Sequence, residues 1–349
     1  MATQQLTGTV DPPARARLRR SLVPDARYVP VLATLGVLVA VFVIGSTRYT
    51  GFLAGQTILN LFIDNSFLIV LAVGMTFVIL TGGIDLSVGS VVALSAIVAA
   101  WLLQHGWPAP LAIVAVLAIG SVFGLLVGLF IHYFEVQPFI ATLAAMFLAR
   151  GLCYVVSLNA IPITDPFFTS MSQTRIPLWR AGTSFDGVTP VYAFISPGVV
   201  LALVVVAAGF FVLHYTRFGR SIYALGGNEQ SATLMGLPVA RTKVLAYVVS
   251  GLCSAIGGLL FAFYSLSGYS LTALGMELDA ISAVVIGGTL LTGGSGFVLG
   301  SLVGVLVLGT VQTILSFEGT LSSWWTKIVI GALLLIFVVL QRILLIVRR

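Results

Sequence analysis

Side chains that could do chemistry are few in this sequence and lie far apart. Neither Lys243 nor Lys327 follows a glycine, so there is no G-x-x-x-x-G-K-[ST] loop to bind a nucleotide phosphate. His105, His132 and His214 have no metal-ligand spacing, and neither a G-x-S-x-G nor an H-E-x-x-H motif is present. The sequence therefore predicts that the chain is not an enzyme, does not hydrolyse ATP, and binds no metal or other cofactor.

Asp85 has the most unusual position of the acidic residues, because it lies in a glycine-rich stretch between two apolar segments. At the centre of a bilayer a carboxylate costs about 2.5–3.5 kcal/mol. It can serve structurally, near the N-terminus of a helix that favours negative charge, or it can belong to a solute pathway. We favour the structural interpretation. No second acid or histidine is placed to receive a proton from it.

A second set of polar and aromatic residues has two interpretations. Asn60, Asp64 and Asn65 interrupt an apolar segment, where they either bond neighbouring helices or recognise hydroxyls of a polar solute. Trp324 and Trp325 precede the last apolar segment, where they either belong to an interfacial aromatic belt or stack on a sugar ring. With Asp85, these are the candidate substrate-pathway residues.

The elements that must position these residues are membrane helices. The chain has 349 residues, of which 59% are hydrophobic and only 8% charged, whereas a soluble domain has about a quarter charged residues. The mean hydropathy is +1.12. Its two cysteines, Cys153 and Cys253, lie in apolar runs and are expected to be buried hydrophobes rather than a disulfide or metal site. Such a chain is solvated by membrane lipid.

We expect an all-α polytopic membrane protein with about ten transmembrane helices, since apolar stretches of spanning length recur along the chain. The segments are 29–46, 58–80, 87–104, 110–131, 138–157, 195–214, 241–263, 277–292, 297–316 and 325–341. With both termini in the cytoplasm, twelve of the 17 lysines and arginines fall on the inner side and four on the outer side. The positive charge thus reflects topology, and it carries no basic aromatic face for nucleic acid.

The segments between the spans define the domain organisation. Residues 1–28 form a basic cytoplasmic N-terminal segment, residues 29–341 the transmembrane permease domain, and residues 342–349 a basic cytoplasmic tail. Within the domain, residues 217–240 form a cytoplasmic loop. Residues 158–194 are polar and rich in proline, and they are expected to be an external loop that either only connects two spans or meets something arriving from outside.

An internal repeat links two of the apolar segments. Residues 80–83 read LTGG and are followed by Gly89-Ser90, and residues 291–294 read LTGG and are followed at the same spacing by Gly300-Ser301. Duplicated halves with glycine-interrupted spans are typical of transporters, because a broken helix leaves backbone groups free to line a pathway. We therefore expect broken helices at both places.

The most informative cytoplasmic segment surrounds a short predicted helix, residues 230–235. Gly226-Gly227 breaks the chain before it, Asn228 can cap it, and Glu229 places a negative charge in its first turn. Gly236 and then Pro238 end it. Two turns of helix are not stable alone, so this helix must dock, either on the membrane or its own loops, or in a groove of a cytoplasmic partner. Ala232, Leu234 and Met235 offer the apolar contact.

Several motifs together resemble the permeases of ribose-type bacterial ABC sugar importers. They are GGIDLSVGS at 82–90, PFIATL at 138–143, RFGR at 217–220, GGNE at 226–229, and ELDAI at 277–281 leading to GGT at 287–289. The resemblance covers residues 50–341. Within the family, IPI at 161–163 and GTLSSWWTK at 319–327 look most like a permease of a galactofuranose importer.

This resemblance implies a function and a set of partners. The function is import of a galactofuranose-like monosaccharide across the bacterial inner membrane. The partners are a cytoplasmic ATPase subunit that binds ATP and Mg, a periplasmic sugar-binding protein and a second permease subunit. In the galactofuranose system the second permease is a different chain. Residues 228–236 are similar to the coupling helix of such permeases, which makes Gly227, Asn228, Glu229, Ala232, Met235 and Gly236 the candidate ATPase-coupling residues.

Three other functions remain to be separated from this one. A secondary transporter driven by an ion or proton gradient also has repeats and broken spans, but it needs an ion site, and intramembrane acids are sparse here. A membrane-embedded enzyme needs a nucleophile and a base in one place, and the sequence shows none. A scaffold subunit would leave uptake unchanged when deleted.

Overall fold

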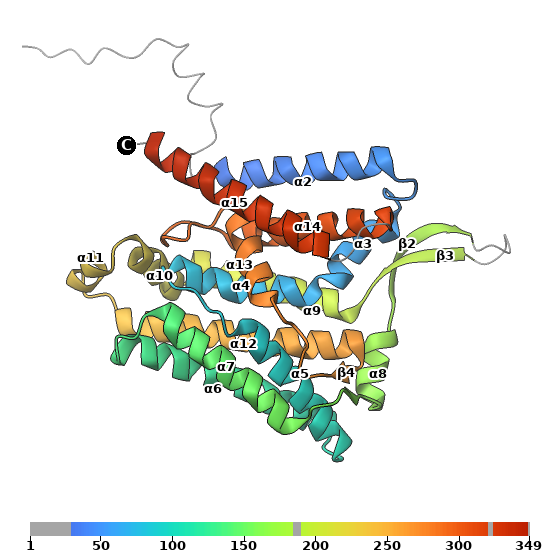
Figure 1. Cartoon of the computed structure of the whole chain (residues 1–349), viewed down its shortest axis with the longest axis horizontal. Helices are drawn as coiled ribbons and strands as arrows, with labels where there is room; N and C mark the ends of the chain where they lie inside the picture. Colours follow the sequence, from blue (N-terminus) through green and yellow to red (C-terminus); the bar gives the residue numbers. More distant parts are fainter. Residues whose placement is uncertain (1–28, 184–189, 320–323, 348–349) are drawn as a thin grey trace, which may run out of the picture.

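The computed structural model describes residues 29–183, 190–319 and 324–347, which form a helical bundle with two small sheets (Figure 1). The predicted basic segment 1–28 and residues 348–349 of the tail lie outside the described residues. The helices are α2 (Val29–Arg48), α3 (Gly55–Asp64), α4 (Ser66–Leu80), α5 (Val88–Gln104), α6 (Ala109–Tyr133), α7 (Pro138–Val156), α8 (Pro166–Gln173), α9 (Pro197–Tyr215), α10 (Arg217–Gly227), α11 (Glu229–Leu234), α12 (Val239–Ser265), α13 (Met276–Ile286), α14 (Val298–Glu318) and α15 (Trp324–Val347). The strands are β1 (Ile161–Pro162), β2 (Ile176–Thr183), β3 (Pro190–Ile195) and β4 (Ser267–Gly268).

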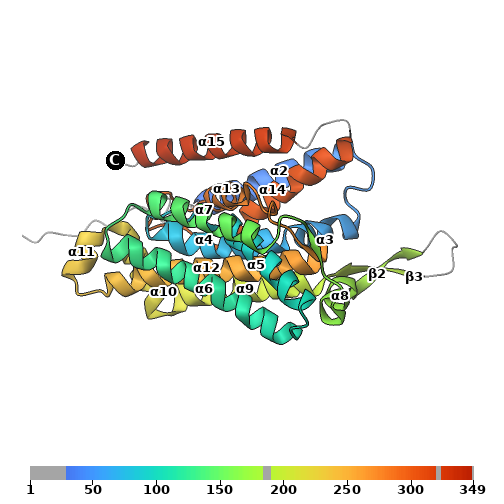
Figure 2. The same cartoon turned by 60° about the horizontal axis from the view of Figure 1, so that its bottom comes forward.

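Helix α4 is the centre of the bundle. Its sequence is apolar on every side, and all of its residues except Phe67 are buried, as expected of a helix without a polar face. It packs against α9, α12, α13 and α14. One polar contact crosses this core: the hydroxyls of Thr76 on α4 and Ser301 on α14 lie 2.7 Å apart. α15 lies on the outside of the bundle, against α13 and α14 (Figure 2).

Each of the ten predicted segments contains a helix, but the helices differ in length. Among the described residues, six helices are long and apolar enough to cross a membrane, or up to seven if α3 and α4, which meet at a 53° bend, are one broken span. Val88–Gln104 and Trp324–Val339 are shorter apolar helices. The segment predicted over 277–292 is helical only as α13, whose 11 residues measure about 16 Å, too short to cross a bilayer of about 30 Å. The count of ten crossings therefore stays a prediction.

Close packing of α6 against α12 depends on glycines at every fourth position. Gly120, Gly124 and Gly128 line the face of α6 that meets α12, where Gly251 lies opposite Gly120 and Gly124, and Val244 lies opposite Gly128. A Cβ atom on Gly251 would lie 2.2 Å from the carbonyl oxygen of Gly120. Small residues at this spacing let two membrane helices approach closely. The spacing is visible in the sequence, and it could have indicated this helix pair in advance.

We expect Gly251→Leu to lower the stability of the bundle, because the added side chain must push α6 away from α12. Overpacking of this kind costs about 1–3 kcal/mol or more. The midpoint of thermal unfolding of the purified chain in detergent measures the effect. Gly151→Leu on α7 is the matched control, since a Cβ there meets nothing within 4 Å. Equal midpoints for the two variants would contradict the close α6–α12 contact.

The described parts of the predicted external loop, residues 158–183 and 190–194, contain regular structure. Asp165 caps α8 by accepting hydrogen bonds from the backbone N–H groups of Phe167 (3.0 Å) and Phe168 (3.1 Å). β2 and β3 form an antiparallel hairpin, and the side chain of Gln56 on α3 bonds both the N–H (3.0 Å) and the carbonyl (3.3 Å) of Phe194. These contacts place the hairpin at one end of the bundle, with α10 and α11 at the opposite end (Figure 1). The described chain begins and ends at the α11 end.

Candidate functional site

Helix α10 connects the long helix α9 to the short α11. The hydroxyl of Thr216 caps it by accepting a hydrogen bond from the N–H of Gly219 at 3.2 Å. Gly219, Ile222 and Leu225 recur every three residues and are buried, so α10 lies with one face on the bundle. The sequence analysis had no helix over 217–227. This spacing of three was the signal that could have indicated it.

Helix α11 confirms the predicted start and end signals. The carboxamide oxygen of Asn228 accepts a hydrogen bond from the N–H of Ser231 at 2.7 Å, and Glu229 is in the first turn. Gly236 has a φ of +73°, the left-handed conformation that ends a helix at glycine. The helix runs over Glu229–Leu234, close to the predicted 230–235.

The apolar residues predicted to be available on α11 are not all exposed. Ala232 is completely buried within the chain, so it cannot offer an apolar contact to a partner. Leu234 and Met235, in contrast, are 89% and 67% exposed. The apolar contact surface of α11 therefore consists of Leu234 and Met235.

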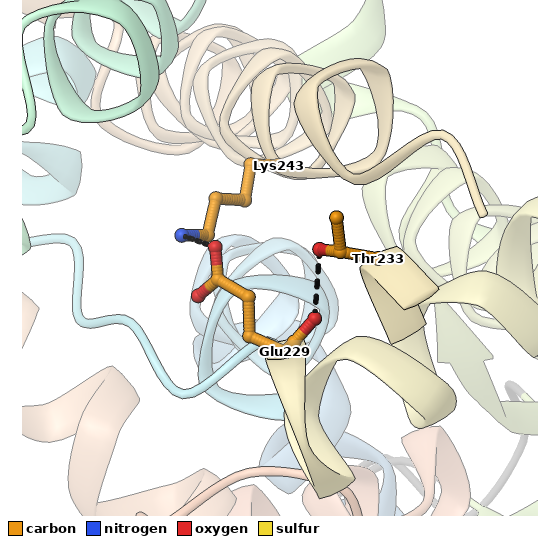
Figure 3. Close-up of polar contacts among 3 residues, drawn as sticks. All are labelled: Glu229, Thr233 and Lys243. Carbon is orange, nitrogen blue, oxygen red and sulfur yellow. Dashed lines mark hydrogen bonds and ion pairs between the residues drawn. The ribbon is translucent and has the colours of Figure 1, made fainter. Parts of the chain in front are cut away.

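An ion pair holds α11 against the start of α12. The ammonium of Lys243 on α12 lies 2.6 Å from a carboxylate oxygen of Glu229, and the hydroxyl of Thr233 donates to the carbonyl of Glu229 at 2.9 Å (Figure 3). Both side chains of the pair are partly solvated, so it contributes at most about 1 kcal/mol. Glu229 thus has its ion-pair partner within this chain, on α12.

The two LTGG repeats and Gly226 meet in one place, which we term the glycine junction (Leu80, Gly82, Gly226, Gly293 and Gly294). The N–H of Gly294 donates to the carbonyl of Leu80 at 2.9 Å, which joins the break after α4 to the break before α14. A Cβ on Gly226 would lie 1.8 Å from the carbonyl oxygen of Leu80 and 2.4 Å from the nitrogen of Gly294. The end of α10 therefore touches the backbone of both breaks directly. The two LTGG stretches lie in the connections from α4 to α5 and from α13 to α14, whereas the bent helix pair among the described residues is α3 with α4, so broken spans at the repeat stay a prediction.

Asp85 is buried in the first break and already has hydrogen-bond partners. It is 2% exposed. One carboxylate oxygen accepts from the N–H (2.9 Å) and hydroxyl (2.6 Å) of Ser87, and the other accepts from the hydroxyl of Ser250 on α12 (2.7 Å). This geometry ties the start of α5 to α12, and it matches the structural interpretation.

We expect Asp85→Ala to lower the free energy of unfolding by about 2–4 kcal/mol, because it leaves two buried hydroxyls without an acceptor. Ser250→Ala removes only one contact and should cost less. Thermal unfolding of the three purified chains in detergent compares them. A normally stable Asp85→Ala protein with an altered KM for uptake would instead place Asp85 in the solute pathway.

The six predicted pathway residues do not come together. Asn65 and Asp85 flank opposite ends of α4, whose 15 residues span about 22 Å. At the α3–α4 bend, Asn65 donates to the carbonyl of Leu61 (2.9 Å), Asn60 accepts from Gln56 (2.8 Å), and Asp64 accepts from the hydroxyl of Tyr264 (3.3 Å).

Trp324 and Trp325 open α15 and are both exposed, and the next charged residue, Lys327, bonds Asp279 on α13 at 2.7 and 2.9 Å. Residues 320–323 of the predicted motif lie outside the described residues.

A cavity near the α3–α4 bend includes residues that the sequence analysis missed. It has a volume of about 210 Å3 and is lined by Ser66, Arg175 and Tyr264 among others, but by none of the six predicted pathway residues. The guanidinium of Arg175 lies 4.6 Å from the centre of the Phe194 ring. Within the described ranges, no group of three His, Cys, Asp or Glu residues could hold a metal ion.

A bundle of long apolar helices that bears a short capped helix at one end is the architecture of a multi-pass membrane protein. Comparison with known proteins agrees: residues 57–338 match the family of branched-chain amino acid transport system / permease components, and the chain belongs to that family.

Its relatives cover almost the whole chain. It is 45% identical over 317 residues to the inner membrane ABC transporter permease protein YjfF of Escherichia coli (90% of this chain and 92% of the relative). It is 43% identical to the fructose import permease protein FruG of Bifidobacterium longum (91% and 92%) and 37% identical to the ribose import permease protein RbsC of Escherichia coli (89% and 92%). No solved structure matches the chain.

Proposed function

We propose that this chain is the membrane permease subunit of an ATP-driven ABC importer that moves a monosaccharide into the bacterial cytoplasm. The observation that carries the proposal is the similarity over about nine-tenths of the chain to permeases named for fructose and ribose import. The sequence has no phosphate loop, so ATP and Mg bind a separate ATPase subunit. A periplasmic sugar-binding protein delivers the solute.

The proposed coupling site is α11 with the glycine junction. The exposed Leu234 and Met235 seat in a groove of the ATPase subunit, while Asn228, Glu229 and Gly236 hold α11 in shape. Movement of α11 reaches the two breaks through Gly226, which is in direct contact with both. This contact of Gly226 with both breaks supports a mechanism in which closure of the ATPase reorients the helices on either side of them.

Finer features of the proposal concern substrate, partner and topology. The sugar is galactofuranose-like, the second permease is a different chain, the protein crosses the inner membrane about ten times, and both termini are cytoplasmic. The motifs at 161–163 and 319–327 support the first two. The sequence assigns twelve lysines and arginines to the inner side and four to the outer side, which supports the topology, since such residues remain inside.

Co-purification from native membrane followed by transport in vesicles tests this function. We expect an ATPase subunit and a second permease to accompany the chain, and sugar uptake to require ATP and the binding protein. A variant ATPase that cannot hydrolyse ATP should abolish uptake. Accumulation of sugar by this chain alone, driven by a proton or sodium gradient, would show a secondary transporter instead. Competition by galactofuranose, ribose and fructose then identifies the sugar.

A further inference from the structure

A basic pocket at the α11 end of the molecule is not used by the proposed transport mechanism. It lies between α10 and the start of α12 and has a volume of about 740 Å3. Arg217, Arg220 and Ala224 line it from one face of α10, and Arg241 and Leu245 line it from one face of α12. Residues three, four and seven apart share a helix face, so one face of α10 lies opposite one face of α12 across the pocket. We term it the arginine pocket.

The three arginines of this pocket have no partner within the part of the chain that the structure describes. Neither an ion pair nor a side-chain hydrogen bond involves Arg217, Arg220 or Arg241 there, although nearby Lys243 is paired with Glu229. All three are exposed. Three guanidinium groups around one concave surface favour an anion, and their planar donors match the oxygens of a phosphate.

The pocket lies where two apolar helices end. Arg217 follows the last residue of α9 by two positions, and Arg241 is the third residue of α12, and both helices are long and apolar enough to cross a membrane. Phe211 and Tyr215 at the same end of α9 are exposed, as expected of aromatic residues at the membrane interface. These positions place the three arginines at the depth of lipid headgroups.

The remaining lining of the pocket is mainly apolar and includes Phe218, Ala224 and Leu245 beside the arginines. A free phosphate ion would leave this surface exposed to water, whereas the glycerol and upper acyl carbons of a lipid would cover it. We propose that the arginine pocket binds the phosphate headgroup of an anionic phospholipid and fixes α10 against α12. Basic pockets between membrane helices bind such headgroups in other proteins.

Lipid binding to the full-length chain, purified in neutral detergent with its co-purifying subunits, tests this proposal. The probe is fluorescent phosphatidylglycerol, with unlabelled phosphatidylglycerol, phosphatidylcholine and glycerol 3-phosphate as competitors. Changing all three arginines to glutamine should weaken binding about a hundredfold, since each basic residue near an anionic lipid contributes about fivefold. The triple lysine variant keeps the charge and should bind within about fivefold of the unchanged protein. Arg180→Gln on β2, at the other end of the bundle, should bind normally.

A change in the apolar part of the pocket distinguishes binding of a lipid from binding of a soluble anion. Ala224→Trp fills part of the pocket and keeps all three charges, so it should weaken phosphatidylglycerol binding severalfold. Competition by glycerol 3-phosphate as strong as that by phosphatidylglycerol would overturn the lipid assignment in favour of a soluble phosphate ester. Unchanged binding by the triple glutamine variant would also overturn the lipid assignment. Binding that occurs only after a co-purifying subunit is removed would overturn it as well, and would assign the arginines to a protein partner.

Discussion

Gly226→Ala should lower ATP-driven uptake by at least about tenfold. The new methyl group would overlap the carbonyl oxygen of Leu80 and the nitrogen of Gly294, 1.8 and 2.4 Å from its carbon. Both are backbone atoms, which cannot rotate away as a side chain can. Overpacking costs about 1–3 kcal/mol even where side chains adjust. Uptake of labelled sugar into vesicles containing the assembled importer measures the loss.

The neighbouring glycine provides the matched control. Gly227 belongs to the same helix, α10, but a Cβ on it meets nothing within 4 Å. Gly227→Ala should therefore retain uptake within about twofold, because it adds the same methyl group to open space. Equal uptake by the two alanine variants would show that the glycine junction is not a close contact in the working protein. Thermal unfolding of both variants separates a loss of coupling from a loss of fold.

The short helix α11 was predictable because its signals are local. Asn228, Glu229, Gly236 and Pro238 stand within eleven residues of one another, and each acts on backbone groups of the same two turns. The buried helix α4 was predictable for a similar reason, since a run of 15 residues without a polar face has one stable environment.

Features that depend on distant contacts could not be predicted in the same way. Leu80, Gly226 and Gly294 are separated by more than sixty residues at each step, and nothing in the local sequence says that they touch. The orientation of Ala232 was wrong because six residues of helix are too few for the apolar period to identify a face. The hairpin of β2 and β3 lay in a proline-rich stretch, whose prolines indicated a loop.

The glycine junction explains why the chain uses two glycines between α10 and α11. One of them, Gly226, is required by the two backbones that it contacts. The other, Gly227, lies in open space immediately before the cap residue Asn228. Gly226, three residues before the start of α11, is therefore in van der Waals contact with both breaks, and a force applied to α11 reaches them through this contact. Movement of α11 can be passed to the two breaks because the contact is close, since packed interfaces shift as units.

Leu234→Asp combined with Met235→Asp should reduce sugar-stimulated ATP hydrolysis and uptake together by about tenfold or more. Both side chains are largely exposed in the single chain, so the changes leave its own packing intact. In the assembled importer each would place a charge in the proposed apolar groove of the ATPase, and burying an unpaired charge costs several kcal/mol. The measurement is hydrolysis and uptake by the same vesicles, with the amount of ATPase that co-purifies.

Gln230→Asp distinguishes lost apolar contact from added charge. Gln230 is exposed and lies four residues before Leu234 on the same face of α11, so this variant adds a negative charge beside the proposed contact and keeps Leu234 and Met235. We expect it to transport severalfold better than the double variant, because it places no unpaired charge where an apolar side chain was. If the double aspartate variant hydrolyses ATP and transports sugar normally, α11 does not dock through its apolar residues, and the ATPase must bind elsewhere at this end of the bundle. If Gln230→Asp fails as badly as the double variant, the contact is electrostatic and depends on the charge of α11 rather than on Leu234 and Met235.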